Sequence, residues 1–316
     1  MSIKARFSIS LPESQSWHNY SLIETGSNPD MLIAPFDGQA LCFKSEEIGA
    51  WLPSKFHDQS PFSELSKSGY LNLLRKAIEF CDSDDKKVVC SRSEFVECSI
   101  DLSSGLNSLR KAYPNAFIYL LELKNQIWIG ASPELLVRRE GNTLQTHSLA
   151  GTRWNNDPFT EKEIKEQEIV TKSILNSLRL TSSHATSPKE VEYGPVKHLQ
   201  SIINWENSDA HAFSDAIKSL HPTPAVCGYP KNDARRFILE HEPNERELYT
   251  GYITCALEGV SYAFVNLRCA KVFSNGIRIF AGGGINKWSD PESEWLETKQ
   301  KIESVKNVLV SSDNNK

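Results

Sequence analysis

Three short turns, each flanked by apolar runs, constrain the fold of this chain more than any other feature of its sequence. Each turn contains Asn or Gly, which accept the positive φ angles that tight hairpins need. The turns lie between the pairs of apolar runs 117–121 and 127–129, 135–137 and 143–145, and 263–272 and 277–280. Each pair predicts two antiparallel strands, so we expect the chain to be built around antiparallel sheet.

Spacing and capping signals predict three helices that interrupt these strands. Apolar residues recur at helical spacing over 63–82, and the form Thr160-x-x-Glu163 is typical of a capping box that opens a helix over 161–180. Asp290-Pro291 supplies an N-cap and a first-turn proline for a helix that ends near residue 310. We expect helices to dominate from 161 to about 242. Without an internal repeat or low-complexity linker, the chain is predicted to form one α+β unit.

Charge and composition exclude several classes of protein. The net charge is −5 and Lys and Arg are spread along the chain, so no basic stripe favours nucleic acid. The amino-terminal stretch does not resemble a signal peptide, and no run of about 18 apolar residues predicts a membrane span. We therefore expect a cytoplasmic protein that binds neither nucleic acid nor membrane. Seven scattered cysteines without a CxxC pair are typical of reduced thiols.

Two of the predicted helices carry groups of carboxylates. Glu294, Glu297 and Lys301 stand at i, i+3 and i+7 of the last helix, within about 60° of one another around its axis. Glu163 and Glu166 lie one turn apart on the helix after Thr160, and carboxylate oxygens from two helices suit Mg²⁺. Either pattern alone is also typical of a solvated helix face.

Other candidates lie on or next to predicted strands. Gly282, Gly283 and Gly284 follow a strand and allow close approach of the backbone to an anion, although they form neither a dinucleotide nor a P-loop motif. Lys87 at a strand start and Glu134 in Ser132-Pro-Glu134 are a candidate base and acid. Their spacing does not show that they meet.

Taken together, seven ordered segments are similar to the chorismate-binding enzyme family. They are Lys87-Val-Val-Cys-Ser-Arg92, Ser132-Pro-Glu-Leu-Leu136, Leu149-Ala-Gly-Thr152, His221-Pro-Thr-Pro-Ala225, Arg246-Glu-Leu-Tyr249, Ile279-Phe-Ala-Gly-Gly-Gly-Ile285 and Glu294-Trp-Leu-Glu-Thr-Lys-Gln-Lys301. The resemblance implies a four-layer α+β fold with two large antiparallel sheets flanked by helices. It implies a single chorismate-binding domain over 1–316, with a shortened, variable part at 1–80 and the core at 81–312.

Variable positions within this resemblance favour an isochorismate synthase. Aminodeoxychorismate synthases carry a lysine where this chain has Ala150, and anthranilate synthases usually lack the lysine found here as Lys87. Salicylate synthases commonly have Thr where this chain has Ala225, but they share the aromatic residue at Tyr249. The resemblance thus implies an isomerase that converts chorismate to isochorismate for menaquinone or siderophore biosynthesis. A salicylate synthase, an anthranilate-synthase-like subunit that depends on a partner, and a non-catalytic domain remain alternatives.

The resemblance also implies roles for individual residues. Lys87 would activate water for attack at ring C2, and Glu134 would protonate the departing C4 hydroxyl. Mg²⁺ would be held by Glu166, Glu294 and Glu297, although the family's Glu-His pair reads Glu166-Gln167 here. The implied substrate-binding residues are Gly151, Thr152, His198, Ala225, Tyr249, Arg268, Gly282, Gly283 and Lys301. The expected partner is chorismate alone, bound by a monomer without an obligate glutaminase subunit.

Overall fold

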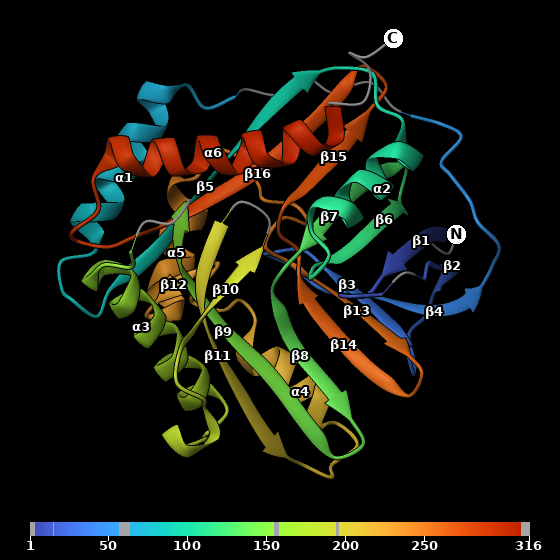
Figure 1. Ribbon diagram of the computed structural model, residues 1–316, viewed down its shortest axis with the longest axis horizontal. Helices are drawn as coiled ribbons and strands as arrows, with labels where there is room; N and C mark the ends of the chain where they lie inside the picture. Colours follow the sequence, from blue (N-terminus) through green and yellow to red (C-terminus); the bar gives the residue numbers. More distant parts are fainter. Residues whose placement is uncertain (1–3, 15, 57–63, 155–157, 194–195, 311–316) are drawn as a thin grey trace.

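The computed structural model describes residues 4–14, 16–56, 64–154, 158–193 and 196–310, which form six α-helices and sixteen strands (Figure 1). The helices are α1 (Lys67–Phe80), α2 (Leu102–Ala112), α3 (Glu161–Ser177), α4 (Ala212–Leu220), α5 (Lys231–His241) and α6 (Pro291–Val310), with one 3₁₀ turn at Ser182–His184. The strands are β1 (Lys4–Ser10), β2 (His18–Glu24), β3 (Met31–Ala34), β4 (Leu41–Glu47), β5 (Lys87–Glu97), β6 (Phe117–Leu123), β7 (Gln126–Ser132), β8 (Leu135–Glu140), β9 (Thr143–Trp154), β10 (Lys189–Tyr193), β11 (Val196–Glu206), β12 (Gly228–Tyr229), β13 (Tyr252–Leu257), β14 (Val260–Val265), β15 (Cys269–Phe273) and β16 (Gly276–Ile285).

All three predicted hairpins are present. Strand β6 pairs with β7, β8 with β9, and β15 with β16, each pair antiparallel. Lys124 and Asn125 have φ angles of 49° and 64°, and Gly141 has a φ of 58°, as the tight turns require. The strands join in one hydrogen-bonded order, β10-β11-β9-β8-β14-β13-β3-β4-β2-β1-β6-β7-β15-β16-β5-β12.

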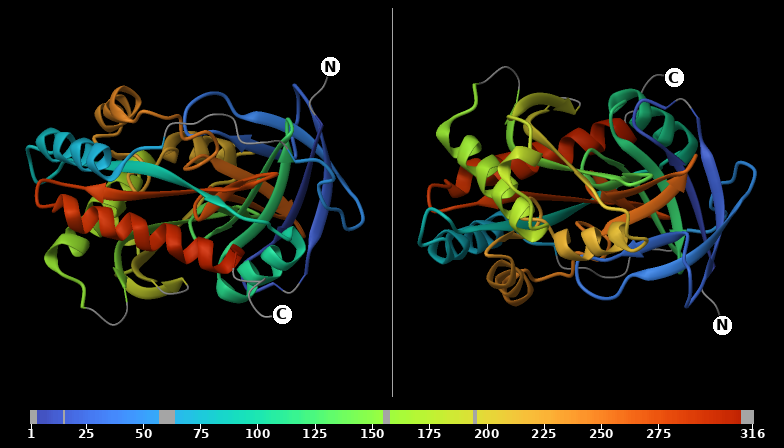
Figure 2. Two further views of the ribbon diagram at one scale, coloured as in Figure 1. Left: turned by 90° about the horizontal axis from the view of Figure 1, so that it is seen from above. Right: turned by 90° about the horizontal axis from the view of Figure 1, so that it is seen from below.

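The strand order folds back on itself around a core of apolar side chains. Phe117 of β6 stacks on Phe264 of β14 with ring centroids 4.4 Å apart, so strands that are distant in the order pack face to face. Helices α2 and α6 pack on the outer face of β6, β7, β15 and β16, and α3 and α4 pack outside β8, β9, β11 and β14. Figure 2 shows the helices on the outer faces. The expected four-layer α+β fold is confirmed, because helices cover both halves of the antiparallel strands.

The predicted helices α1, α3 and α6 are also present, with the signals that were expected to start them. Thr160 and Glu163 form the reciprocal capping box of α3. Asp290 caps α6, since its Oδ1 accepts a hydrogen bond of 2.9 Å from the backbone nitrogen of Ser293. No described helix is both long and apolar enough to cross a membrane.

Two sequence expectations about elements need correction. Helices α3, α4 and α5 lie within 161–242 as expected, but so do β10 and β11, which the sequence did not predict, and β11 pairs with β9 along its length. Along β11, Leu199, Ser201 and Ile203 are buried and alternate with partly exposed residues, a period of two that polar residues in the strand concealed. The run 263–272 is two strands, β14 and β15, because the chain leaves the sheet between them.

The break between β14 and β15 has a local cause. The Asn266 side chain is buried, donates to the Leu248 carbonyl at 2.9 Å and accepts from the Tyr119 hydroxyl at 2.7 Å. Arg268 adopts a φ of 45°, a left-handed conformation that a continuous strand does not allow. This conformation directs the chain at Arg268 along the wall of a cavity.

Candidate active site

A cavity of about 120 Å³ lies between β5, β9, β16, α3 and α6. Most of the residues singled out in the sequence line it: Lys87, Glu134, Gly151, Glu166, His198, Ala225, Tyr249, Arg268, Gly282, Glu297 and Lys301. Thr152 pairs with His198 between β9 and β11, but its side chain lies outside the described residues. Gly283 and Glu294 do not line the cavity themselves, and Gly284 takes the place expected for Gly283.

Lys87 is the first residue of β5 and is only 2% exposed. Its Nζ donates to Oε1 of Glu166 at 2.6 Å. A buried ammonium requires such a partner, because an isolated buried charge is strongly disfavoured. The structure therefore brings the candidate base of β5 into direct contact with a candidate metal ligand of α3.

Glu134 follows β7 and is 4% exposed. Burial raises the pKa of its carboxyl to about 7, although a hydrogen bond from Thr223 and the charge of Lys87 act in the opposite direction. The Thr223 hydroxyl donates to Oε1 of Glu134 at 3.2 Å. A carboxyl with a pKa near neutrality is suited to donate a proton at physiological pH.

Another part of the cavity wall is basic. Lys301 Nζ donates to the carbonyl of Gly282 at 2.9 Å and to Oε1 of Glu297 at 2.7 Å, and Arg268 lies near His198. His198 Nδ1 is 3.2 Å from the carbonyl oxygen of Gly151, so it carries the proton that this acceptor requires. Burial, followed by the charges of Arg268 and Lys301, lowers the pKa of His198 to about 3. His198 is therefore neutral at working pH, and this side of the cavity suits an anion through Arg268 and Lys301.

Three carboxylates surround the glycine pair Gly283 and Gly284 of β16. A Cβ atom added to Gly284 would lie 2.5 Å from Oε1 of Glu166, and one added to Gly283 would lie 3.2 Å from Oε2 of Glu294. The Gly283 position is also 4.0 Å from Oε1 of Glu297. The absence of side chains at both glycines thus leaves space between the carboxylates of α3 and α6.

The donor set of Glu166, Glu294 and Glu297 fits Mg²⁺, which prefers carboxylate oxygens. In the described part of the chain, no three His, Cys, Asp or Glu side chains are gathered as a metal centre. Glu166 and Glu297 instead contact the ammonium groups of Lys87 and Lys301. Metal binding therefore requires rearrangement of these two ion pairs.

Gln167 is a positioning residue whose role the sequence did not reveal. It is buried, and its Nε2 donates to the Ser148 carbonyl at 3.1 Å and to the Ser201 hydroxyl at 3.3 Å. These bonds tie α3 to β9 and β11, and so direct the preceding residue, Glu166, into the cavity. Glu163 is not part of the site, because its carboxylate caps α3 and pairs with Arg153 at 2.8 Å.

Apolar and backbone groups complete the cavity wall. The sequence assigned no role to seven further lining residues, although the first four lie within the recognised segments: Val89, Pro133, Leu149, Phe280, Val226, Thr250 and Leu267. Tyr249 stacks on Phe280 with ring centroids 5.5 Å apart, which holds this aromatic wall in place. Several of these residues stand next to predicted site residues in the chain, and that adjacency was the available signal.

Comparison with known proteins identifies similar sequences and folds. The model of the family described as chorismate binding enzyme matches residues 22–310. Component 1 of anthranilate synthase from Aeropyrum pernix is 32% identical over 274 residues, which cover 80% of this chain and 63% of that protein. Isochorismate synthase EntC of Escherichia coli is 34% identical over 243 residues, which cover 71% of this chain and 62% of the relative. The chain therefore spans less than two thirds of the length of either relative.

A solved structure extends this similarity to the fold. MenF, the menaquinone-specific isochorismate synthase from Escherichia coli, aligns with a TM-score of 0.77 over 96% of this chain and 88% of the other. The two are 22% identical in sequence. At this identity the alignment establishes a shared fold.

Proposed function

The chain belongs to the chorismate binding enzyme family, and on this premise we propose that it is an isochorismate synthase, a Mg²⁺-dependent isomerase that converts chorismate to isochorismate. The observation that carries the proposal is the burial of Lys87 and Glu134 in one cavity. A base and an acid on one substrate are what hydroxyl transposition requires. Relatives with the isochorismate synthase name support the same activity.

The charged groups of the cavity suit a substrate with two carboxylates, as chorismate has. Arg268 and Lys301 bind one carboxylate, with Arg268 supplying the planar guanidinium that favours paired hydrogen bonds. Glu166, Glu294 and Glu297 would hold Mg²⁺, which when bound would neutralise the charge of the other carboxylate. Tyr249 and Ala225 line the space left for the ring.

The proposed reaction moves a hydroxyl group from ring C4 to ring C2. Lys87 acts in its neutral amine form, once Glu166 no longer pairs with it: its Nζ accepts a proton from a water molecule whose oxygen bonds to C2, and the ring double bond shifts. Glu134 gives its proton to the departing C4 hydroxyl, which leaves as water. One water is consumed and one released, so the product is an isomer of the substrate. Burial of Glu134 supports this role because it keeps a substantial fraction of the carboxyl protonated near pH 7.

An anthranilate synthase is the second candidate, because a relative of that name is 32% identical to this chain. That reaction uses ammonia as nucleophile and releases pyruvate. Lys87 and Ala150 favour water as the nucleophile, on the resemblance described for the sequence. A salicylate synthase differs by a further elimination of pyruvate, and the aromatic Tyr249 is compatible with it.

Product analysis tests the proposal directly. The purified chain is incubated with chorismate and Mg²⁺, with chelator in one control and ammonium chloride in another, and products are separated by liquid chromatography. We expect isochorismate, no pyruvate, and loss of turnover with chelator. Salicylate with pyruvate would identify the lyase, and anthranilate formed only with ammonium would identify the second candidate. No consumption of chorismate would contradict the proposed activity.

A further inference from the structure

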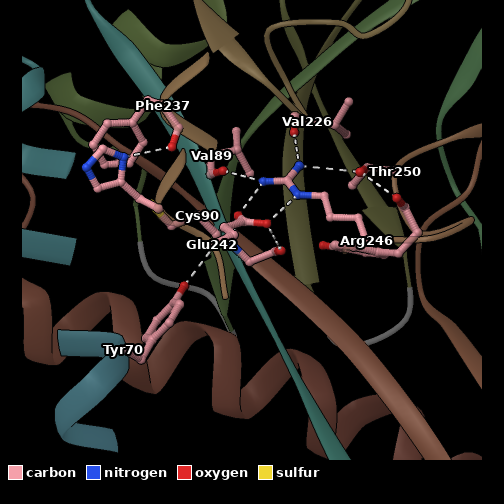
Figure 3. A network of polar contacts seen from close by, with 11 residues as sticks. Tyr70, Val89, Cys90, Val226, Phe237, Glu242, Arg246 and Thr250 are labelled. Atoms are coloured by element: carbon pink, nitrogen blue, oxygen red, sulfur yellow. Dashed lines mark hydrogen bonds and ion pairs between the residues drawn. The ribbon is translucent and has the colours of Figure 1, made fainter. Parts of the chain in front are cut away.

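Arg246 and Glu242 form a buried ion pair (Figure 3), which contacts residues that line the cavity. The side chains of Arg246 and Glu242 are 2% and 4% exposed. Arg246 Nη2 donates to Oε1 of Glu242 at 2.6 Å, and its Nε donates to Oε2 at 2.8 Å. Burying two charges carries a desolvation cost that often cancels their attraction, so such a pair is poor evidence of a stabilising role. The hydrogen bonds that Arg246 and Glu242 make to other segments indicate the role of the pair.

Both partners bind backbone atoms of distant segments. Arg246 donates to the carbonyl of Val89 at 2.6 Å and to that of Val226 at 2.7 Å. Glu242 accepts from the backbone nitrogen of Ser91 at 2.7 Å and from its hydroxyl at 2.8 Å. The pair therefore joins β5 to the segment that precedes β12. Figure 3 shows the guanidinium between Val89 and Val226.

The same guanidinium reaches a third segment of the wall. Arg246 Nη1 lies 3.3 Å from the Thr250 hydroxyl, which in turn donates to the carbonyl of Tyr249 at 2.6 Å. Val89, Val226, Tyr249 and Thr250 all line the cavity. One side chain thus connects three walls of the proposed active site.

The edge of β5 that carries Lys87 has only a short backbone ladder on the side of β12. Strand β12 supplies only two residues there, with Gly228 opposite Val88 and Tyr229 opposite Lys87. On its other side, β5 pairs with β16 along ten positions. Two residues beyond Lys87, the Val89 nitrogen donates to the Cys227 carbonyl at 2.9 Å, and the Val89 carbonyl accepts from Arg246.

We propose that Arg246 and Glu242 are positioning residues that hold β5 and the segment before β12 at a fixed separation, and thereby place Lys87 for catalysis. Arginine suits this position because its planar fork donates in several directions at once, which a lysine ammonium on a flexible stem does not reproduce. The inference rests on the proposed function for its kinetic test. The positioning role can also be tested by a measurement that does not depend on enzymatic activity.

The kinetic test uses the double variant E242Q/R246Q and the single variant R246K. The double variant removes both charges, so neither is left buried without its partner. Asp233→Asn and Arg236→Lys are matched controls, because this exposed pair at 3.0 Å lies on the adjacent helix α5. At a temperature well below the melting transition of every variant, we expect kcat to fall about 10- to 100-fold in both test variants. KM should stay within about threefold of wild type, because a displaced base affects mainly the transition state.

The second test measures the accessibility of Lys87 by reductive methylation and peptide mass spectrometry. We expect the Lys87 amine to be labelled at least about fivefold faster in both test variants than in wild type, with the controls unchanged, since local opening exposes protected groups. Wild-type labelling and near-wild-type kcat in folded test variants would overturn the inference, as would an equal fall in the controls. If wild type does not isomerise chorismate, the proposed function fails while the labelling experiment still decides the positioning role.

Discussion

The carboxyl of Glu134 links burial to pH at the scale of a single residue. Its pKa is raised by burial from 4.5 to about 7. Below pH 4.5 the carboxyl is protonated in both the folded and the unfolded chain, so it does not reduce stability. Between pH 4.5 and 7 the unfolded carboxyl ionises while the folded one stays protonated, and stability is lost. Above pH 7 both forms are ionised, and the free energy of unfolding stays lower by the full amount.

Glu134→Gln should therefore stabilise the protein at high pH. The amide retains an oxygen that accepts from Thr223 and carries no charge to desolvate. We expect the gain in the free energy of unfolding, measured with urea, to rise from near zero at pH 4.5 to about 3 kcal/mol at pH 8. Glu140→Gln on the exposed end of β8 is the control. A gain that is the same at every pH would contradict the raised pKa.

Lys87→Gln should abolish the proposed reaction, because glutamine cannot accept a proton from water. A loss of about 100-fold or more in kcat is expected, within the range for a general base. Lys86→Gln is a matched control one residue earlier, where the lysine pairs with Asp82 at the surface. Initial rates of isochorismate formation measure both variants, and activity of Lys87→Gln near the wild-type level would remove Lys87 from the mechanism.

At the scale of the element, the end of β16 depends on having no side chains. A Cβ on Gly284 would lie 2.6 Å from Cε of Lys87 as well as 2.5 Å from Oε1 of Glu166, whereas the nearest atom to a Cβ on Gly283 is Oε2 of Glu294 at 3.2 Å. The two glycines therefore differ in how much displacement a methyl group causes.

Gly284→Ala should lower turnover more than Gly283→Ala does. We expect a fall of about 100-fold for Gly284→Ala, because it displaces both the proposed base and a metal ligand, and about tenfold for Gly283→Ala. Gly49→Ala is the control, since nothing lies within 4 Å of its added Cβ. Steady-state kinetics with circular dichroism to confirm folding measure the effect, and the reverse order of the two losses would argue against this geometry.

Local signals in the sequence predicted elements well where hairpin turns and caps specify them. The β6-β7 turn at Lys124 and Asn125 and the capping box of Thr160 and Glu163 both act within a few residues. Strand β11 was missed because its alternation of buried and exposed residues can be recognised only when β9 is known to lie beside it. Propensity over a short window does not contain that information.

The sequence predicted which residues belong to the candidate site, but not which of them contact one another. The sequence motifs named Lys87 and Glu166, yet their contact joins residues 79 positions apart. Likewise, Arg246 stands in a motif that was recognised, but its bond to Val89 spans 157 positions. Such long-range contacts follow from the order of the strands in the sheet, which the spacing of residues within a motif does not determine.

At the scale of the whole molecule, the proposed metal ligands come from opposite sides of the fold. Glu166 lies on α3, which packs outside β9 and β11, whereas Glu294 and Glu297 lie on α6, which packs outside β15 and β16. The cavity is thus a meeting point of two outer layers. A cation bound there would link the layers, in place of the separate contacts to Lys87 and Lys301.

Mg²⁺ should consequently stabilise the whole protein. A ligand that binds only the folded state at 100 times its Kd adds about 2.7 kcal/mol to the free energy of unfolding. We expect a rise in Tm with increasing Mg²⁺, strengthened by chorismate, and loss of most of this rise in Glu166→Gln and Glu297→Gln. Glu168→Gln is the matched control, because this residue is exposed on the same helix as Glu166. Differential scanning fluorimetry measures the shift, and an equal Mg²⁺ response in Glu166→Gln, Glu297→Gln and wild type would place the cation elsewhere.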